Sequence, residues 1–110
     1  MSVKVKRNVI TMTRGDTLSL QVEITYEDGT PYEPVEGDSI RFAVKKDFYD
    51  AAPLIVKKIP IETLVLQLDP ADTKTMNIGE YRYDIELTTH DGRVDTFIPW
   101  TKFILTEEVI

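Results

Sequence analysis

Strict alternation of apolar and polar residues constrains this chain more than any other feature of its sequence. Over residues 17–26 every second side chain is apolar, namely Leu18, Leu20, Val22, Ile24 and Tyr26. Over residues 80–87 the same period recurs, with Tyr81, Tyr83, Ile85 and Leu87. A period of two is typical of a strand that buries one face and exposes the other. The chain is therefore predicted to form antiparallel sheets around one core.

The remaining strands are predicted from shorter runs of the same pattern, at residues 8–13, 39–46, 54–59, 62–68 and 94–106. Turns are expected at residues 14–16 and 27–31, and residues 31–38 are expected to form an exposed connection because they combine prolines, glycine and acids. Pro60 limits its strand to an edge or an end. One short helix is expected over residues 71–76, with Asp69 as N-cap and Pro70 at the first helical position.

The last two strands pose a problem of register. If Asp91 and Gly92 occupy the centre of a tight hairpin, Tyr83 pairs with Trp100, and Phe103 and Leu105 face water. So many exposed apolar side chains are implausible in a soluble domain. A β-bulge near Pro99 shifts the register by one residue and returns Phe103 and Leu105 to the core, so we predict that bulge.

These elements predict an all-β fold, an immunoglobulin-like β-sandwich of about seven antiparallel strands with one short helix between the fifth and sixth strands. Asn77, Gly79 and Tyr81 have the spacing of a tyrosine corner, so the Tyr81 hydroxyl is expected to bond to upstream backbone. Residues 1–110 are expected to form a single domain, with residues 1–7 as a flexible N-terminal arm. The predicted core between the sheets comprises Leu20, Val22, Phe42, Leu66, Ile85 and Phe103.

Composition and charge exclude several classes of function. The chain has no cysteine, which removes disulfides, thiolate metal sites and a cysteine nucleophile. Its net charge of −6 opposes the neutralisation of phosphates on which non-specific nucleic-acid binding depends. We expect no nucleic-acid partner and no membrane partner, because no basic amphipathic helix or long apolar run is present. The basic start of the chain lacks the apolar run of a secretory signal, so synthesis is expected in the cytoplasm.

Residues that carry chemistry are sparse and scattered. His90 is expected on a hairpin tip, and Ser19 on the polar face of a strand, so we predict no catalytic residues and a protein that is not an enzyme. Glu33, Glu36 and Asp38 are favoured as a solvated acidic loop over a calcium site, and no metal or cofactor is expected. The Arg-Gly-Asp triplet at residues 14–16 is interpreted as a turn rather than an adhesion motif. Two lysine pairs, at residues 45–46 and 57–58, fit either a small basic patch or solvated strand ends.

Five motifs together resemble a known family: residues 12–17, 40–46, 69–74, 79–87 and 91–93. Over residues 11–109 the chain is similar to the small β-sandwich found in phage and prophage tail genes, in particular the N-terminal domain of the phage baseplate upper protein. The resemblance implies a virion structural or assembly protein in the tail, baseplate, neck or head decoration, made in the bacterial host cytoplasm. Its implied partners are phage structural proteins and further copies of itself, and no catalytic residue is carried over.

The bulged register leaves Phe97 and Trp100 as the apolar residues with least claim on the core. With the apolar residues Val109 and Ile110 they are our candidate protein-contact residues, because exposed aromatics mark interfaces. The alternative interpretation of Trp100 is that it closes one end of the core. The alternative function is a carbohydrate- or cell-surface-binding sandwich, for which Tyr32, Phe48 and Tyr49 are further aromatic candidates.

Overall fold

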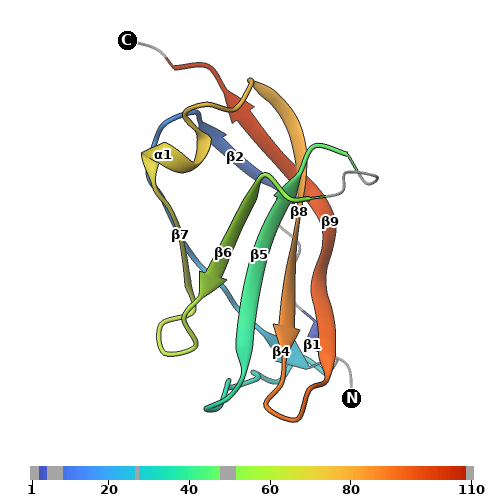
Figure 1. The fold of residues 1–110 in the computed structure, drawn as a ribbon. Coiled ribbons are helices and arrows are strands. Elements are labelled where there is room, and N and C mark those ends of the chain that lie inside the picture. Colours follow the sequence, from blue (N-terminus) through green and yellow to red (C-terminus); the bar gives the residue numbers. More distant parts are fainter. Residues whose placement is uncertain (1–2, 5–8, 27, 48–51, 109–110) are drawn as a thin grey trace.

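A computed structural model describes residues 3–4, 9–26, 28–47 and 52–108, with the side chains of residues 3–4 and 97–99 left out of the description. The order of elements is β1 (Val3–Lys4), β2 (Ile10–Thr13), β3 (Leu18–Gln21), β4 (Thr25–Tyr26), β5 (Ser39–Lys45), β6 (Ile55–Ile59), β7 (Val65–Leu68), α1 (Pro70–Thr73), β8 (Gly79–Thr88) and β9 (Val94–Thr106). The fold is therefore all-β apart from one short helix, as predicted (Figure 1).

The main sheet has five strands in the order β2-β9-β8-β5-β6, and β3 pairs with β7 in a separate sheet. The short strands β1 and β4 form a third pair. Buried residues from the main sheet and from the β3–β7 sheet belong to a single cluster, which includes Phe42 from β5, Leu66 from β7 and Phe103 from β9. We call the face of the main sheet that contributes to this cluster the inner face, and the opposite one the outer face.

Alternation predicted the faces of most strands correctly. Five of the six predicted core residues are buried, and Leu20 is half-buried at the margin of the cluster. Ala43 is buried, with 6% of its surface exposed, although it alternates along β5 with the inner-facing residues. Its small side chain is opposite Val56 and Asp84, which have larger side chains, on the two neighbouring strands. Strand β6 lies at an edge of the sheet, which confirms the limit set by Pro60.

The first of the predicted strands, which is β2 in the structure, differs from the expectation that all pairing is antiparallel. Strand β2 pairs with β9 in parallel, with Ile10 opposite Phe103 and Met12 opposite Leu105. The turn after β2 is anchored where β9 ends, because the Arg14 amide donates to the Thr106 carbonyl at 3.0 Å. The chain then crosses to the other sheet instead of folding back as a hairpin, so β2 and β3 never pair.

The long alternating segment at residues 17–26 is interrupted. Strand β3 ends at Gln21, and β4 covers only Thr25 and Tyr26, although Val22 and Ile24 between them are buried. Alternation thus reports which side chains face the core but not how far the ladder of hydrogen bonds extends. Strand β7, the partner of β3, begins at Val65 rather than at the expected residue 62. A turn precedes it, in which the Leu64 amide donates to the Pro60 carbonyl at 2.8 Å.

Strand β9 contains the predicted bulge and a second one. Pro99 and Trp100 lie opposite the single residue Asp84, since Tyr83 pairs with Thr101 and Ile85 with Ile98. The resulting register places Phe103 opposite Tyr81, and Phe103 is fully buried as predicted. The bulge near Pro99 is therefore confirmed.

The second bulge, at Phe97, compensates for a hairpin loop that differs from the predicted one. The loop is three residues long, because the Thr89 amide donates to the Arg93 carbonyl and the Gly92 amide to the Thr89 carbonyl. Gly92 has φ of +90°, the left-handed conformation that closes such loops. This loop starts β9 one residue out of the expected register, and the extra residue at Phe97 restores it.

Helix α1 is a single turn and ends at Thr73, earlier than the expected residue 76. Its N-cap is Asp69, and the Asp72 carboxylate accepts a hydrogen bond from the Asp69 amide at 2.7 Å. The hydroxyl of Tyr81 donates to the carbonyl of Asn77 at 2.6 Å, which confirms the expected corner bond. Among the described residues, no helix is long and apolar enough to cross a bilayer.

Truncation of the core should destabilise the fold strongly. Phe42 and Leu66 are fully buried in one cluster. We expect Phe42→Ala and Leu66→Ala to lower the free energy of unfolding by about 2–5 kcal/mol each, because both remove apolar contacts and leave a cavity. Chemical denaturation measures this, with the exposed Val94→Ala as a control that should stay close to the parent. Melting of both core variants within a degree of the parent would contradict the assignment of faces.

Loss of the corner hydroxyl should have a smaller effect. Tyr81 is buried and its hydroxyl bonds to Asn77. We expect Tyr81→Phe to lose about 0.5–1.5 kcal/mol, the usual net contribution of one hydrogen bond. The half-buried Tyr26, in β4, offers the matched substitution Tyr26→Phe at a site distant from α1. A denaturation midpoint that is unchanged in Tyr81→Phe would show that the corner bond does not stabilise the fold.

Candidate functional site

The structure describes only part of the predicted contact set. Trp100 is half-buried and lies in the bulge of β9 with φ of +38°, a left-handed conformation that is strained for a side chain of this size. The backbone of Phe97 forms the second bulge, and its side chain is outside the description. Val109 and Ile110 lie outside the described residues. Both aromatics are thus in irregular backbone of β9, in its two bulges.

Asp84, which the sequence analysis did not single out, faces Trp100 across the bulge. One of its carboxylate oxygens, Oδ1, is buried and has no hydrogen-bond partner among the described parts of the chain. Burial raises the pKa of Asp84 and the negative charge of Glu86 adds to this, while Arg41 and Lys45 oppose it. An unsatisfied buried carboxylate beside a strained bulge is costly, and such positions are concentrated at functional surfaces. The sequence indicated Asp84 only as an acidic residue opposite Pro99 on the neighbouring strand.

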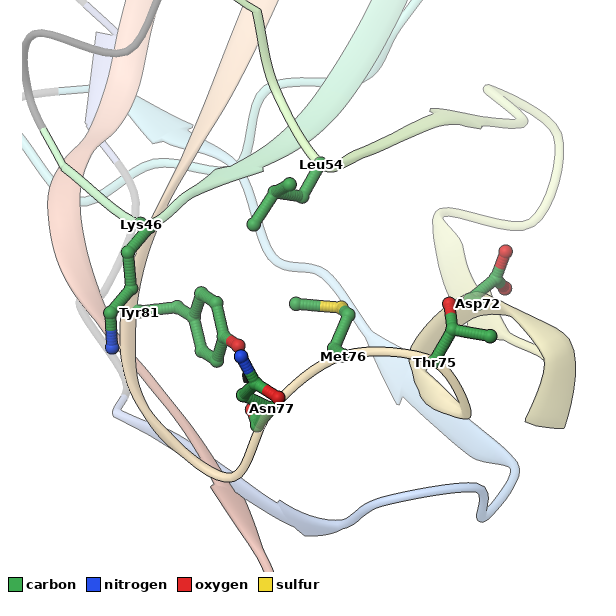
Figure 2. A pocket seen from close by; sticks show the side chains of 7 residues that line it. All are labelled: Lys46, Leu54, Asp72, Thr75, Met76, Asn77 and Tyr81. Atoms are coloured by element: carbon green, nitrogen blue, oxygen red, sulfur yellow. Dashed lines mark hydrogen bonds between the residues drawn. The ribbon is translucent and has the colours of Figure 1, made fainter.

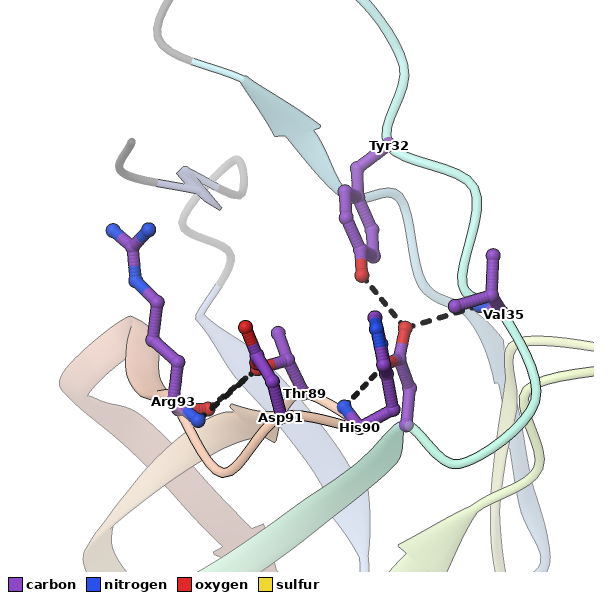
Figure 3. Close-up of polar contacts among 7 residues, drawn as sticks. Tyr32, Val35, Thr89, His90, Asp91 and Arg93 are labelled. Carbon is purple, nitrogen blue, oxygen red and sulfur yellow. Dashed lines mark hydrogen bonds and ion pairs between the residues drawn. The ribbon is translucent and has the colours of Figure 1, made fainter.

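A second polar cluster joins the loop before β5 to the hairpin between β8 and β9, and its centre is Asp38. The Asp38 side chain is fully buried. Its carboxylate accepts hydrogen bonds from the Tyr32 hydroxyl at 2.6 Å, the Val35 amide at 3.0 Å and the His90 amide at 2.9 Å (Figure 3). The His90 ring nitrogen Nδ1 lies 3.4 Å from the same carboxylate.

These contacts decide the charge of Asp38. Burial acts to raise its pKa, but the hydrogen bonds from Tyr32, Val35 and His90 outweigh burial, so the pKa lies below the usual value. Burial and the adjacent carboxylate raise the pKa of Tyr32 well above its usual value. Asp38 is therefore an ionised structural anchor, and the expected exposed acidic loop is wrong at this residue: the loop buries its last acid to hold two turns together.

The Asp38–His90 pair resembles the acid and base of a hydrolytic triad, and it lacks the nucleophile. His90 is on the hairpin loop, as predicted, with its side chain 60% exposed. Within the described ranges, no serine hydroxyl is hydrogen-bonded to His90, and no group of three or more potential ligands surrounds a metal position. The arrangement supports positioning of a loop rather than proton transfer.

A pocket of about 440 Å³ lies between the turn after α1 and the end of β5. Leu54, Met76 and the Tyr81 ring line its middle, with Lys46 at one end and Asp72 at the other (Figure 2). The two charged groups are engaged within the chain. The Lys46 ammonium donates to the Glu80 carbonyl at 2.9 Å, and the Asp72 carboxylate is 3.0 Å from the Lys57 ammonium. We assign this pocket to the packing of α1 against the sheet.

The Arg-Gly-Asp triplet has a structural explanation. The Gly15 amide donates to the Thr73 hydroxyl at 2.8 Å, and Gly15 has φ of +81°, which favours glycine. Arg14 pairs with Glu108 and donates to the Met76 carbonyl. The triplet thus joins β2 to α1 and to the segment after β9.

The two lysine pairs do not gather into one patch. Lys57 faces Asp72 on the inner side of β6, and Lys46 covers the Tyr81 ring at 4.6 Å from its centroid. Lys45 and Lys58 are on the outer face, but they are far apart along the sheet. In the strand register Lys58 lies opposite Arg41, and Lys45 lies opposite Arg82.

A comparison with protein-family models found no match for this chain, and a comparison with the curated proteins found none either.

Removal of the Asp38 charge should destabilise the protein in a pH-dependent way. Because its pKa is lower in the folded state, Asp38 stabilises the fold fully above the unfolded pKa, and this contribution is lost as the pH falls through the folded pKa. We expect Asp38→Asn to lose about 1.5–3 kcal/mol at pH 7, the usual contribution of a hydrogen bond to a charged group. The difference from the parent should shrink below about pH 4, where unfolded aspartate is protonated.

Urea denaturation at pH 7, 5 and 3 measures this difference. The exposed Asp16→Asn is the matched control and should track the parent at each pH. A deficit of Asp38→Asn that stays constant down to pH 3 would mean that its charge does not contribute to the anchor.

Proposed function

We propose that this chain is a non-enzymatic immunoglobulin-like β-sandwich module that acts through protein–protein contacts, as a structural or assembly component of a phage virion. The order β2-β9-β8-β5-β6 against β3-β7, with a short helix before β8 and a tyrosine corner at its start, supports this sandwich assignment. The resemblance of motifs to the tail-gene sandwich supports a location in the virion. The candidate parts are the tail, the baseplate, the neck and the head decoration.

The observation that carries the contact function is the bulge in β9. Burial of Phe103 and Leu105 explains the shift in register. It does not explain why a tryptophan occupies the strained left-handed position in the bulge. Trp100 is also opposite Asp84, whose buried oxygen has no hydrogen-bond partner within the part of the chain that the structure describes. A docked protein that supplies a donor to this carboxylate would satisfy its buried oxygen, and covering the half-buried indole would add apolar contact. The last strand is therefore our proposed contact.

The presence of the chain in particles is the first test. Mass spectrometry of virions purified from a lysate should detect this chain at a fixed ratio to the tail or head proteins. Its recovery only from the soluble fraction, with none in the particles, would refute a structural role in the virion.

The contact surface has a separate test. Trp100→Ala and Phe97→Ser should each weaken self-association or binding to co-expressed virion proteins by about tenfold or more, as truncation of a central aromatic in an interface does. Light scattering measures the mass of the complexes. Val35→Ala removes another exposed apolar side chain, in the loop before β5, and should leave the mass unchanged. Folded variants of both aromatics that keep the parent's mass and partner binding would exclude the last strand as the contact.

A further inference from the structure

Strand β6 is an edge of the main sheet, and its side away from β5 is open. Its partner in the sheet is β5 alone. Within the described ranges, no group of the chain forms a hydrogen bond with the N–H and C=O groups of residues 55–59 that point away from β5. Pro53 and Pro60 bound this open edge. The chain therefore presents a short row of unpaired backbone groups at strand spacing.

The open edge begins beside the pocket that the packing of α1 leaves. From the turn at residues 60–64, β6 and β7 diverge, and α1, which follows β7, stands opposite the start of β6 (Figure 1). Lys57 of β6 spans this opening, with its ammonium 3.0 Å from the Asp72 carboxylate of α1. Leu54, just before β6, and Met76, after α1, line the pocket of about 440 Å³ (Figure 2). We call the open edge of β6 together with this pocket the β6–α1 groove.

Three side chains along this edge are exposed. Leu54 is 55% and Val56 is 52% exposed, although both are large and apolar. Lys58 is exposed and lies opposite Arg41, a like charge, which pairs with Glu86 on its other side at 3.7 Å. Lys58 itself forms no ion pair with any residue that the structure describes. Like charges directly opposite each other destabilise a sheet. Apolar contact at the start of the edge and an acid beside Lys58 would therefore both be favourable.

The chemistry of the edge identifies its occupant. Alternating N–H and C=O groups at strand spacing are matched by an extended polypeptide, because its own backbone repeats with the same period. A second copy of β6 is a poor match, since Lys57 and Lys58 of both chains would share one short ladder and each chain has a net charge of −6. The complementary occupant is a strand of another protein.

We propose that the β6–α1 groove binds an extended segment of a partner protein, which joins the main sheet as a strand antiparallel to β6. The backbone of the segment pairs with the open edge, an apolar side chain opposite Ile55 enters the pocket, and an acidic side chain three positions earlier faces Lys58. This inference rests on the proposed function as a protein-contact module. It assigns a second contact to that module, on a strand that is not a neighbour of β9.

The blocked peptide Thr-Glu-Thr-Val-Leu-Thr is the probe for this groove. Its glutamate precedes its leucine by three positions, as the antiparallel register requires. Titration at millimolar concentrations, followed by amide chemical shifts, should show saturable binding with shifts centred on residues 54–59 and 72–76. The open-edge amides of β6 should also exchange more slowly with solvent in the complex, because the added strand supplies their acceptors.

Modified peptides separate strand addition from other modes of binding. In an antiparallel ladder every second amide of a strand points to its partner. Of two peptides that carry methyl groups on alternate amides, one should therefore lose binding and the other should retain it. Replacement of the peptide leucine by alanine should lower the affinity about tenfold or more, because it removes the group that fills the pocket.

Variants of the groove have matched controls elsewhere on the surface. Leu54→Ala should lower the affinity at least about fivefold. Val94→Ala, at an apolar residue that is 56% exposed, should keep the parent's affinity. Lys58→Gln should lower the affinity about two- to threefold at low salt, the scale of an exposed ion pair, and the exposed Lys102→Gln should not. Thermal melts establish that all four variants are folded.

Four results would overturn the proposal: no saturable binding, shifts centred away from the groove, equal effects of the two methylated peptides, or an equal loss in Leu54→Ala and Val94→Ala. Self-association that Leu54→Ala abolishes would place a second copy in the groove and refute an external segment. These outcomes are independent of the Trp100→Ala test, so the groove can fail while the contact through the last strand stands, and the reverse.

Discussion

The register of β9 against β8 determines whether this chain has a core at all. Phe103 and Leu105 are fully or almost fully buried, and they pair with Tyr81 and Gly79 only because extra residues are inserted nearer the hairpin. A slip of one residue would turn every side chain after the bulge to the opposite face. Strand β2 would lose its partner too, since Ile10 and Met12 pair in parallel with the same two residues of β9. Two edges of the core thus depend on one irregular stretch of backbone.

Polar contacts hold the two ends of this framework. At one end the buried Asp38 carboxylate joins the loop before β5 to the hairpin that starts β9. At the other end Tyr81 and Gly15 bond to the segment around α1. The Asp38 and Gly15 contacts join segments distant in sequence, whereas the Tyr81 bond spans only four residues. They provide partners for polar groups whose burial would otherwise be costly. The hairpin loop is therefore fixed before β9 departs from regular geometry, which keeps the irregularity local.

Much of the fold could be predicted because burial acts on side chains with a period that is visible in the sequence. The faces of β5, β8 and the later part of β9 follow from it, and so does the bulge, since only a shifted register buries Phe103. The parallel pairing of β2 could not be predicted, because parallel and antiparallel strands bury the same residues. Asp38 was assigned to a solvated loop because its neighbours are polar; its burial depends on donors from His90, which is distant in the sequence.

The neighbours of the β9 bulge on the outer face could not be predicted from the sequence, for a related reason. Cross-strand neighbours can be identified only once the register is known, and Arg82 and Lys102 become neighbours through the same bulge that buries Phe103. In the register without that bulge, Lys102 would be on the inner face, where a charge is costly. The insertion that completes the core therefore also brings Lys102 beside Arg82 and Glu80 on the outer face of the sheet. Because the two faces alternate along one strand, a change that shifts this register alters the stability of the core and the charge pattern of the outer face together.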